Sequence, residues 1–311
     1  MTNILLIGGA GFIGSNIIAH LYKSKEIRIS VLEPVFSSLH RISEYPVQVY
    51  RGCIDDTDML ESIIARDDID TVVHLVSTIV PGSGFCEFQK EFSSVIFPSI
   101  RLMEICSRKK IRFIYFSSGG TIYGNHKEKY VPFTEECPIA PISYYGWSKQ
   151  MMENSVLYMH RTKNLQYMII RPSNPYGMGQ NLYGNQGIIA VALGKILSRE
   201  KITVWGDGNS IRDYIYIDDL GKAVSDILLR KDIVNMTLNI GSGKGYSVNE
   251  IIEVLRNIAE EDVLVEYVPA RQVDVSSVVL DISRLNQLVN FNPLGINEGI
   301  GKFYKYVKDG R

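Results

Sequence analysis

The chain has 311 residues, of which 45% are hydrophobic and 22% are charged, and its formal net charge is −1. This length suffices for a large core or two lobes, and the near-neutral charge argues against binding to nucleic acid or to a membrane surface. No apolar run approaches the roughly 20 residues of a membrane span, so we expect a soluble, cytoplasmic enzyme.

The cysteines and the amino terminus agree with that expectation. Cys53, Cys86, Cys106 and Cys137 are far apart, with no CxxC spacing and no neighbouring histidine pair. They are predicted to be reduced thiols, so we expect neither a disulfide framework nor a metal site. The first residues show no charged segment or cleavage site of a secretory signal.

A glycine-rich turn follows the first predicted strand. Residues 4–7 (ILLI) have the length of a strand, GGAGFIG follows them, and residues 15–22 are predicted to form a helix. This order is the context of a dinucleotide site, although the spacing here is G-x-x-G-x-x-G. Gly8 permits the tight turn, Gly11 lets the backbone approach a pyrophosphate, and Gly14 permits close packing of helix on strand. An ordinary glycine-rich turn is the alternative.

The second predicted strand, residues 29–32, ends at an acidic residue. Glu33 stands nineteen residues after Gly14. An acid at this place can accept hydrogen bonds from the ribose hydroxyls of adenosine, and it would repel a 2′-phosphate. The sequence therefore predicts NAD rather than NADP as the cofactor.

Strands and helices alternate through the rest of the first half. Further strands are predicted at residues 47–50, 71–76, 112–116 and 166–170, and helices at residues 56–64, 91–108 and 145–160. Such alternation is typical of an α/β fold with a doubly wound parallel sheet between two helical layers. Ligands bind beyond the carboxyl ends of the strands, where the glycine turn, Glu33 and the pair Ser117-Ser118 are expected to lie.

Tyr145 and Lys149 are four residues apart in a predicted helix, so their side chains should share one face. A free tyrosine has a pKa of about 10, and a fixed cation beside it favours the phenolate. Lowering that pKa to ~7 takes roughly 4 kcal/mol, which a buried ammonium and an oxidised nicotinamide ring could supply. The pair is predicted to transfer protons in hydride chemistry. By itself the spacing also fits an exposed helix face.

The second half is less regular. Residues 171–184 are rich in Pro, Gly, Asn and Tyr and are predicted to form a long loop. Helices are predicted at residues 187–197, 219–229 and 248–259, and strands at residues 203–205 and 237–240. We expect residues 1–172, with returns near 212–240, to bind NAD, and residues 173–311 to form mainly a smaller α/β substrate lobe.

Several ordered motifs together resemble a known family over nearly the whole chain. They are GGAGFIG (8–14), Glu33, FSSGGTIYG (116–124), SYYGWSK (143–149), RPSNPYG (171–177), GDGNSIRDYIYIDDL (206–220), NIGSGKGYSVNEI (239–251), and Arg271 with Asp274. The chain is similar to the extended short-chain dehydrogenases/reductases, in particular the nucleotide-sugar epimerases and dehydratases. The resemblance implies a Rossmann-type fold and tightly bound NAD that is regenerated in each turnover. It also implies C4 epimerisation of a UDP-hexose through a transient 4-keto sugar.

The resemblance also assigns roles. Tyr145 would act as acid and base at the C4 hydroxyl, and Lys149 would hold the nicotinamide ribose. Arg212 and Arg271 would bind the diphosphate, although Arg212 could instead form a surface ion pair with the next residue. Trp205 resembles the residue that packs on the base, with a simple core position as the alternative. Expected cofactor contacts are Gly8, Gly11, Phe12, Ile13, Gly14, Glu33, Asp55, Leu75, Ser77, Ser117, Tyr145, Lys149 and Pro172, and expected substrate contacts are Asn174, Trp205, Arg212, Arg271, Asp274 and Val278.

One expected catalytic hydroxyl is missing. Gly119 stands where the family usually carries a serine or threonine, so Ser118, Thr121 or water must supply the hydrogen bond to the C4 oxygen. Gly120 and Thr121 occupy the places of the acidic pair that dehydratases use. The related decarboxylases also use an acid there, so neither reaction is expected.

Two positions depart from the family on the cofactor side. Cys53 replaces an aspartate that often contacts adenine, and either Asp55 compensates or that hydrogen bond is absent. Ile79 replaces a lysine that is common in the best-known epimerases. Neither change removes the predicted NAD site.

The resemblance further implies a substrate preference. Val278 corresponds to a position that limits the room beside C2 of the hexose. A tyrosine there admits glucose and galactose only, whereas small residues admit N-acetyl sugars, and the neighbouring Ser277 would support the same inference. We expect interconversion of UDP-GlcNAc and UDP-GalNAc, with or without UDP-Glc and UDP-Gal.

Other functions stay open at this point. One is a reductase or epimerase of a dTDP-, GDP- or CDP-linked sugar; a reductase would release its cofactor in each turnover. Another is a non-catalytic NAD-binding protein, which Gly119 alone favours. The resemblance implies a homodimer formed through the helix near residues 91–108 and the helix that carries Tyr145. Polysaccharide biosynthesis and galactose metabolism would both fit.

Overall fold

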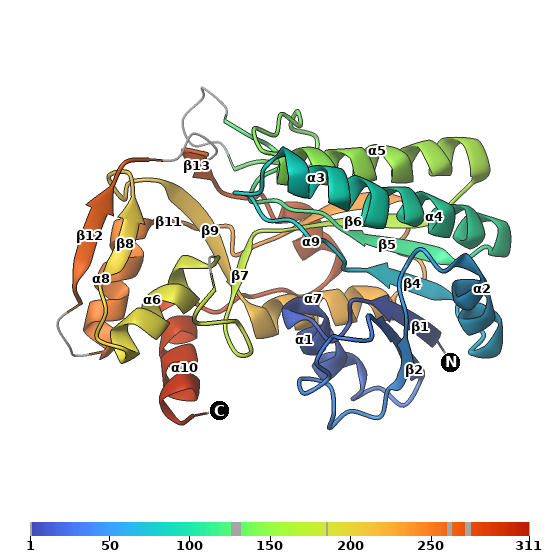
Figure 1. Ribbon diagram of the computed structural model, residues 1–311, viewed down its shortest axis with the longest axis horizontal. Helices are drawn as coiled ribbons and strands as arrows, with labels where there is room; N and C mark the ends of the chain where they lie inside the picture. Colours follow the sequence, from blue (N-terminus) through green and yellow to red (C-terminus); the bar gives the residue numbers. More distant parts are fainter. Residues whose placement is uncertain (1, 126–131, 185, 260–262, 271–274, 311) are drawn as a thin grey trace. The chain divides into compact units, whose positions relative to one another are not determined.

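The computed structural model describes residues 2–125, 132–184, 186–259, 263–270 and 275–310 (Figure 1). The chain forms two compact units. Residues 1–118, 143–171 and 221–238 make up the first unit, and residues 119–142, 172–220 and 239–311 make up the second. Arg271 and Asp274 lie outside the described residues. None of the helices within the described ranges has the length and apolarity needed to cross a bilayer.

A seven-stranded sheet organises the first unit. Its strand order is β3 (Gln48–Arg51), β2 (Ile27–Glu33), β1 (Thr2–Ile7), β4 (Thr71–His74), β5 (Arg112–Phe116), β6 (Tyr167–Pro172) and β10 (Met236–Ile240). Neighbouring strands from β3 to β6 pair in parallel. The order 3-2-1-4-5-6 is that of a Rossmann-type sheet, which confirms the predicted fold class.

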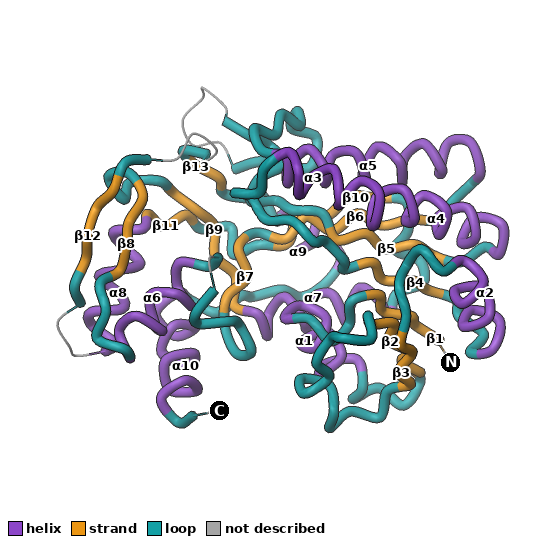
Figure 2. The backbone as a smooth tube through the Cα atoms, in the orientation of Figure 1, coloured by secondary structure: helices purple, strands orange, loops and turns teal. Residues whose placement is uncertain are grey.

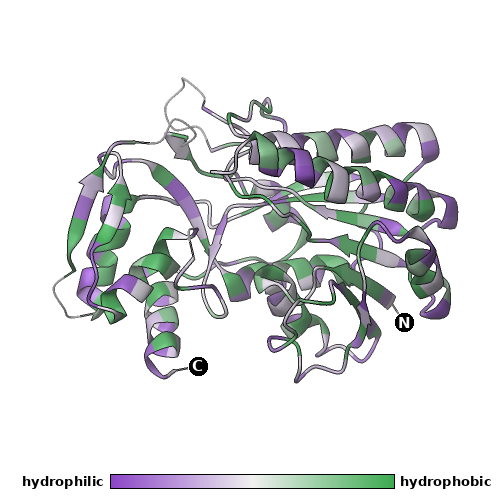
Figure 3. Ribbon diagram, in the orientation of Figure 1, coloured by the Kyte–Doolittle hydropathy of each residue, from purple (hydrophilic) through white to green (hydrophobic). Residues whose placement is uncertain are grey.

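Helices cover both faces of this sheet (Figure 1). One face carries α2 (Thr57–Arg66), α4 (Phe97–Lys109) and α5 (Tyr144–Lys163), and the other carries α1 (Phe12–Leu21) and α7 (Ile217–Leu229). All residues of β1, β4 and β5 are buried, as expected for strands between two helical layers. Hydrophobic residues accordingly recur along the central strands (Figure 3).

The second unit contains smaller sheets. In one of them β9 (Ile211–Tyr216) pairs with β11 (Gly245–Ser247), β13 (Ser277–Val278) and β7 (Asn174–Tyr176). In another, β8 (Ile202–Trp205) and β12 (Val265–Val268) run side by side (Figure 2). The helices α6 (Ile188–Leu197), α8 (Val248–Ala259) and α10 (Ile296–Lys308) pack around a second core, and α9 (Ser283–Leu288) follows β13.

Three predicted elements need correction. The single helix predicted at residues 91–108 is α3 (Phe85–Glu91), then a π-helical turn η1 (Phe92–Ile96), then α4. The loop predicted at residues 171–184 contains β7. Its partner β9 lies far along the chain and has no predicted counterpart, so no local pattern could mark their pairing. The strand predicted at residues 71–76 ends at His74.

Asp213 joins β9 to two later segments of the second unit. Its fully buried carboxylate accepts hydrogen bonds from the N–H groups of Ser242 (2.7 Å), Gly243 (3.1 Å) and Leu280 (3.3 Å), and from the Ser242 hydroxyl (2.8 Å). Gly241 makes this approach possible, since a Cβ there would lie 2.4 Å from the Asp213 Oδ2. Burial raises the pKa of the carboxyl, and the hydrogen bonds oppose that rise.

Gly241→Ala is therefore expected to lower the free energy of unfolding by about 2–3 kcal/mol. The new methyl group would displace the Asp213 carboxylate and leave buried N–H donors unpaired. Gly301→Ala is the matched control, because a Cβ at Gly301 in α10 meets nothing within 4 Å and alanine favours helix. Denaturant unfolding of both variants measures the difference, and an equal effect would contradict this account of Asp213.

Candidate active site

The glycine turn between β1 and α1 has the geometry of a phosphate-binding turn. Gly8 has a φ of +84°, which lies in the left-handed region that favours glycine. Gly11 is the N-cap of α1 and gives it no side-chain cap, so the first N–H groups of the helix can face an anion. A Cβ at Gly14 would lie 2.6 Å from the carbonyl oxygen of Gly9, which requires glycine for the close packing of helix on strand.

Two buried polar groups stand at the carboxyl ends of strands β2 and β5. The Glu33 carboxylate, at the end of β2, accepts a 2.6 Å hydrogen bond from the N–H of Ala10, which fixes it against the glycine turn. Ser117 follows β5, and its buried Oγ has no hydrogen-bond partner in the described part of the chain. A buried polar atom without a partner fits a polar ligand at this edge. The turn, the acid and the hydroxyl together fit a dinucleotide such as NAD.

The other residues predicted to contact the cofactor differ in their contacts and in their exposure. Leu75 continues β4 by donating its N–H to the Ile7 carbonyl oxygen at 3.0 Å. The Ser77 hydroxyl donates to a carboxylate oxygen of Glu91 at 3.0 Å. Asp55 is exposed in the turn before α2. Phe12 and Ile13 open α1, whereas Pro172, at the end of β6, belongs to the second unit.

The helix α5 presents Tyr145 and Lys149 together, as their spacing predicts. Its N-cap Ser143 accepts a 3.1 Å hydrogen bond from the Gly146 N–H, which starts the helix just before the pair. The buried Lys149 Nζ donates to the Phe116 carbonyl oxygen at 3.1 Å. It also lies 5.4 Å from the centre of the Tyr145 ring.

Burial is the largest cause of the pKa shifts of Tyr145 and Lys149. Desolvation raises the pKa of Tyr145 to about 12, a hydrogen bond with Ser118 opposes the rise, and the charge of Glu91 adds to it. Desolvation lowers the pKa of Lys149 to about 8, and the charges of Glu91 and Glu153 oppose that fall. The predicted lowering of the Tyr145 pKa by the ammonium and an oxidised nicotinamide ring together stays a prediction. In the protein alone, burial disfavours the charged form of both groups and is the largest influence on each pKa.

Ser118 provides a hydroxyl in contact with Tyr145. Both residues belong to the first unit, and their side chains are hydrogen-bonded. Thr121, the other candidate to replace the hydroxyl missing at Gly119, belongs to the second unit. The N–H of Gly119 donates to the Pro172 carbonyl oxygen at 2.8 Å.

A hollow in the second unit brings three of the predicted substrate residues together. Asn174 from β7, Trp205 from β8 and Arg212 from β9 line it, along with Tyr176 and Tyr214. Trp205 is 48% exposed, so it is not a simple core residue. The hollow therefore offers an amide, an exposed indole and a guanidinium to one ligand.

Arg212 and Asn174 are held by the backbone of the same unit. The guanidinium donates to the carbonyl oxygens of Ile211 (2.8 Å) and Val275 (2.5 Å), and the Asn174 amide donates to the carbonyl oxygen of Asp213 (2.8 Å). The Asp213 side chain is fully buried, so a surface ion pair between Arg212 and Asp213 is excluded.

Val278 is not among the residues that line this hollow. It pairs with Arg212 in the β13–β9 register, but its side chain is 1% exposed and packs with Ile122, Tyr123 and Leu280. Its neighbour Ser277 is half-buried. The structure thus pairs Val278 with Arg212 along the backbone and places the valine side chain in a small core.

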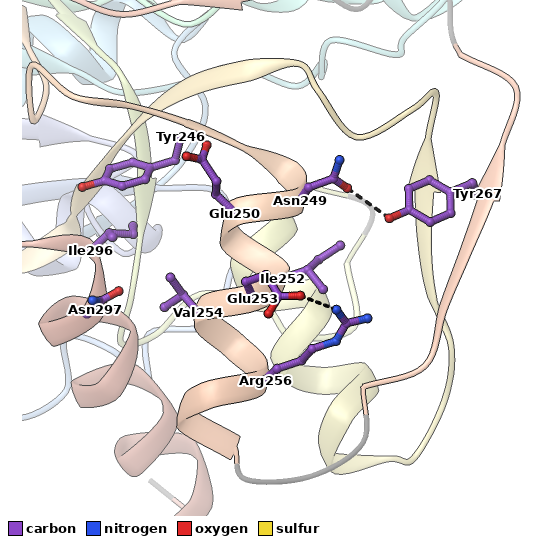
Figure 4. A pocket seen from close by; sticks show the side chains of 10 residues that line it. All are labelled: Tyr246, Asn249, Glu250, Ile252, Glu253, Val254, Arg256, Tyr267, Ile296 and Asn297. Atoms are coloured by element: carbon purple, nitrogen blue, oxygen red, sulfur yellow. Dashed lines mark hydrogen bonds and ion pairs between the residues drawn. The ribbon is translucent and has the colours of Figure 1, made fainter.

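A second hollow of this unit is lined by α8 and by residues of β12 and α10 (Figure 4). Two pairs of its polar side chains are bonded: the Tyr267 hydroxyl donates to Asn249 at 3.0 Å, and Arg256 donates to Glu253. No residue predicted for the site lines it. Within the described ranges, no group of three or more His, Cys, Asp or Glu side chains could hold a metal ion.

Comparison with known proteins gives a consistent result. Residues 4–241 match the family model described as the NAD dependent epimerase/dehydratase family. A UDP-glucose 4-epimerase of Neisseria meningitidis serogroup A is 31% identical, over 91% of this chain and 90% of its own. A dTDP-4-dehydro-6-deoxyglucose reductase of Escherichia coli is 29% identical over 98% of this chain and 97% of its own. The structure of the Thermotoga maritima UDP-glucose 4-epimerase with UDP-glucose has a TM-score of 0.92 and 29% identity, over 99% of both chains.

Proposed function

The chain belongs to the NAD-dependent epimerase/dehydratase family, and on that premise we propose that it is a UDP-sugar 4-epimerase. The observation that carries the proposal is the group of Tyr145, Lys149 and Ser118 in the same unit as the glycine turn. This unit would bind NAD. The second unit would bind the nucleotide sugar through the hollow lined by Trp205 and Arg212.

The cofactor fits the residues present. The glycine turn and the N-terminus of α1 would hold the pyrophosphate of NAD, and Glu33 would accept hydrogen bonds from the adenosine ribose. When bound, NAD supplies a hydride acceptor for the sugar C4 and a positively charged nicotinamide ring. Lys149 is fixed by the Phe116 carbonyl and would hold the nicotinamide ribose.

The chain's own groups would handle the proton and the diphosphate. Tyr145 would take the proton from the C4 hydroxyl and return it, and Ser118 would share a hydrogen bond with the phenol oxygen or the sugar oxygen. Arg212 would bind the diphosphate, because a guanidinium fork suits paired phosphate oxygens. Arg271 and Asp274 would also contact the substrate, as the sequence predicts.

Substitution of the two hydroxyl residues tests this assignment. Tyr145→Phe is expected to lower epimerisation at least ~100-fold, because it removes the group that exchanges the proton. Ser118→Ala should lower it about 10-fold through loss of one hydrogen bond, and Thr121→Ala should have a smaller effect. The assay incubates each variant with UDP-, dTDP-, GDP- and CDP-hexoses and separates the C4 epimers by chromatography. A fully active Tyr145→Phe variant would exclude this mechanism.

A second candidate function is supported by the 29% identity with the dTDP-4-dehydro-6-deoxyglucose reductase. A reductase consumes a reduced cofactor in each turnover, whereas an epimerase regenerates NAD. Two measurements distinguish these functions. An epimerase is expected to purify with stoichiometric NAD and to show no net consumption of NADH with 4-keto sugars. Steady NADH consumption would favour the reductase.

We propose UDP-GlcNAc and UDP-GalNAc as the preferred substrate pair, with Val278 as the residue that leaves room at C2. Val278→Tyr is expected to abolish turnover of the N-acetyl substrates and to spare UDP-Glc and UDP-Gal. Because Val278 is buried, thermal unfolding of the variant must first show that it folds. Parallel assays of both sugar pairs measure the ratio, and an equal loss in both would contradict the proposal.

We also propose that a second copy of the chain packs against α3, η1, α4 and α5. These elements expose the large side chains Phe85, Phe92, Phe97, Trp147 and Tyr158, each between 43% and 59% exposed. Exposed apolar residues grouped in this way are typical of interfaces. Helices α4 and α5 carry both hydrophobic and hydrophilic residues along their length (Figure 3).

Phe97→Glu is expected to shift the protein from dimer to monomer, because a charge would be buried in the interface. Leu229→Glu is the control, since Leu229 is a comparably exposed apolar residue (42%) at the end of α7. Light scattering after size exclusion gives the mass of each variant. A monomeric wild-type protein at micromolar concentration would contradict the proposal.

A further inference from the structure

Glu91 is a buried carboxylate next to the proposed catalytic group that no motif of the sequence marks. It is 2% exposed. Its Oε2 accepts hydrogen bonds from the N–H (2.8 Å) and the hydroxyl (2.6 Å) of Thr78, and its Oε1 accepts one from the Ser77 hydroxyl (3.0 Å). These bonds fix the segment that follows β4, at the edge of the sheet where the glycine turn lies.

Glu91 ends a helix that packs against α5. Glu91 is the last residue of α3, and the π-helical turn η1 starts at the next residue. Single π-helical turns are frequent at functional sites. One turn earlier, Phe88 stacks on Trp147 (4.8 Å between ring centres) and on Tyr144 (5.3 Å), which flank Tyr145 in sequence. The end of α3 is therefore clamped to the first turns of α5.

Glu91 supplies the main negative charge near Lys149, because the other nearby carboxylate is already paired. Glu153, one turn further along α5, forms a two-pronged ion pair with Arg171, with distances of 2.9 and 2.6 Å. Its charge is therefore largely neutralised. Among the described residues, Glu91 accepts hydrogen bonds from two hydroxyls and one N–H, all neutral, so these donors hold its charge without cancelling it. A buried ammonium needs such a counter-charge to stay protonated.

We propose that Glu91 is a positioning residue that keeps Lys149 protonated and holds the Ser77–Thr78 segment beside the site. The inference deepens the proposed function. Besides Tyr145, the described residues that face Lys149 with titratable groups include Tyr115 from β5, whose ring centre is 5.3 Å from Nζ, and His74 from β4. Burial lowers the pKa of His74 to about 3, so this ring is neutral at working pH. Burial raises the pKa of Tyr115, so it is neutral too.

The sign of the effect follows from these charges. A negative charge at Glu91 raises the pKa of both Lys149 and Tyr145, as the structure indicates. Removal of that charge lowers both values. If activity needs a protonated lysine and a tyrosine that can ionise, both limbs of the pH–rate profile move toward lower pH.

The first experiment is a double-mutant cycle on unfolding, which needs no activity. Glu91→Gln is expected to raise the unfolding equilibrium constant at pH 6.5 at least ~5-fold more in the wild-type background than in Lys149→Met. At pH 9.5 this coupling should vanish, because Lys149, with a pKa of about 8 in the folded protein, is neutral there. Glu104→Gln is the control; Glu104 pairs with Lys163 on the surface and should show no coupling to Lys149.

The second experiment measures kcat against pH for the purified enzyme and its Glu91→Gln variant. The whole profile is expected to move about one pH unit toward acid. A purely structural role would lower activity and leave the profile in place. An active enzyme that shows neither the coupling between Glu91 and Lys149 nor the shift of the kcat profile would overturn the role of Glu91. Coupling in a protein that epimerises no nucleotide sugar would overturn the proposed function and leave the role of Glu91 standing.

Discussion

Removal of the Lys149 ammonium from water is the constraint on which this site depends. A buried ammonium is costly unless hydrogen bonds and opposite charge compensate it. Here the Phe116 carbonyl oxygen accepts a hydrogen bond from the ammonium, two tyrosine rings lie beside it, and Glu91 supplies a negative charge. The lysine stays poised, with a pKa of about 8, close to the pH at which an enzyme would use it. The same burial raises the pKa of Tyr145, and a further positive charge near the phenol would favour its ionised form.

The parallel sheet explains how distant residues reach this lysine. Strands that run in one direction place their carboxyl ends at one edge, so β1, β2, β4 and β5 deliver the glycine turn, Glu33, Ser77 and Ser117 there. The helix α5 carries Tyr145 and Lys149 in its first turns, since Ser143 caps it just before Tyr145. Each group is carried by an element whose own position is fixed by buried strands, so little of the site depends on long loops.

Local patterns sufficed for much of this arrangement. The glycine turn, the strands of the first half and α8 follow from short runs of sequence, because apolar periodicity and glycine placement act within a few residues. β7 did not follow, since it has three residues and pairs with a strand far along the chain. β9 has no predicted counterpart, although its run of Ile and Tyr residues favours a strand. The cation next to Tyr145 is visible in the sequence, whereas the loss of water that raises the tyrosine pKa in the protein alone follows only from packing.

The missing hydroxyl at Gly119 illustrates how a site can keep its chemistry after a substitution. A catalytic hydrogen bond needs a donor at the phenol oxygen, and the chain position of that donor matters only through geometry. Ser118 follows β5 in the same unit as Tyr145, and its hydroxyl already bonds to the tyrosine. The tyrosine pKa is lowered by that bond, so Ser118 supplies part of what the expected residue would have supplied. The steric demand for glycine in this loop lies at the next residue: a Cβ at Gly120 would lie 3.1 Å from the Asn174 amide oxygen, so a side chain there would crowd a residue proposed to meet the substrate.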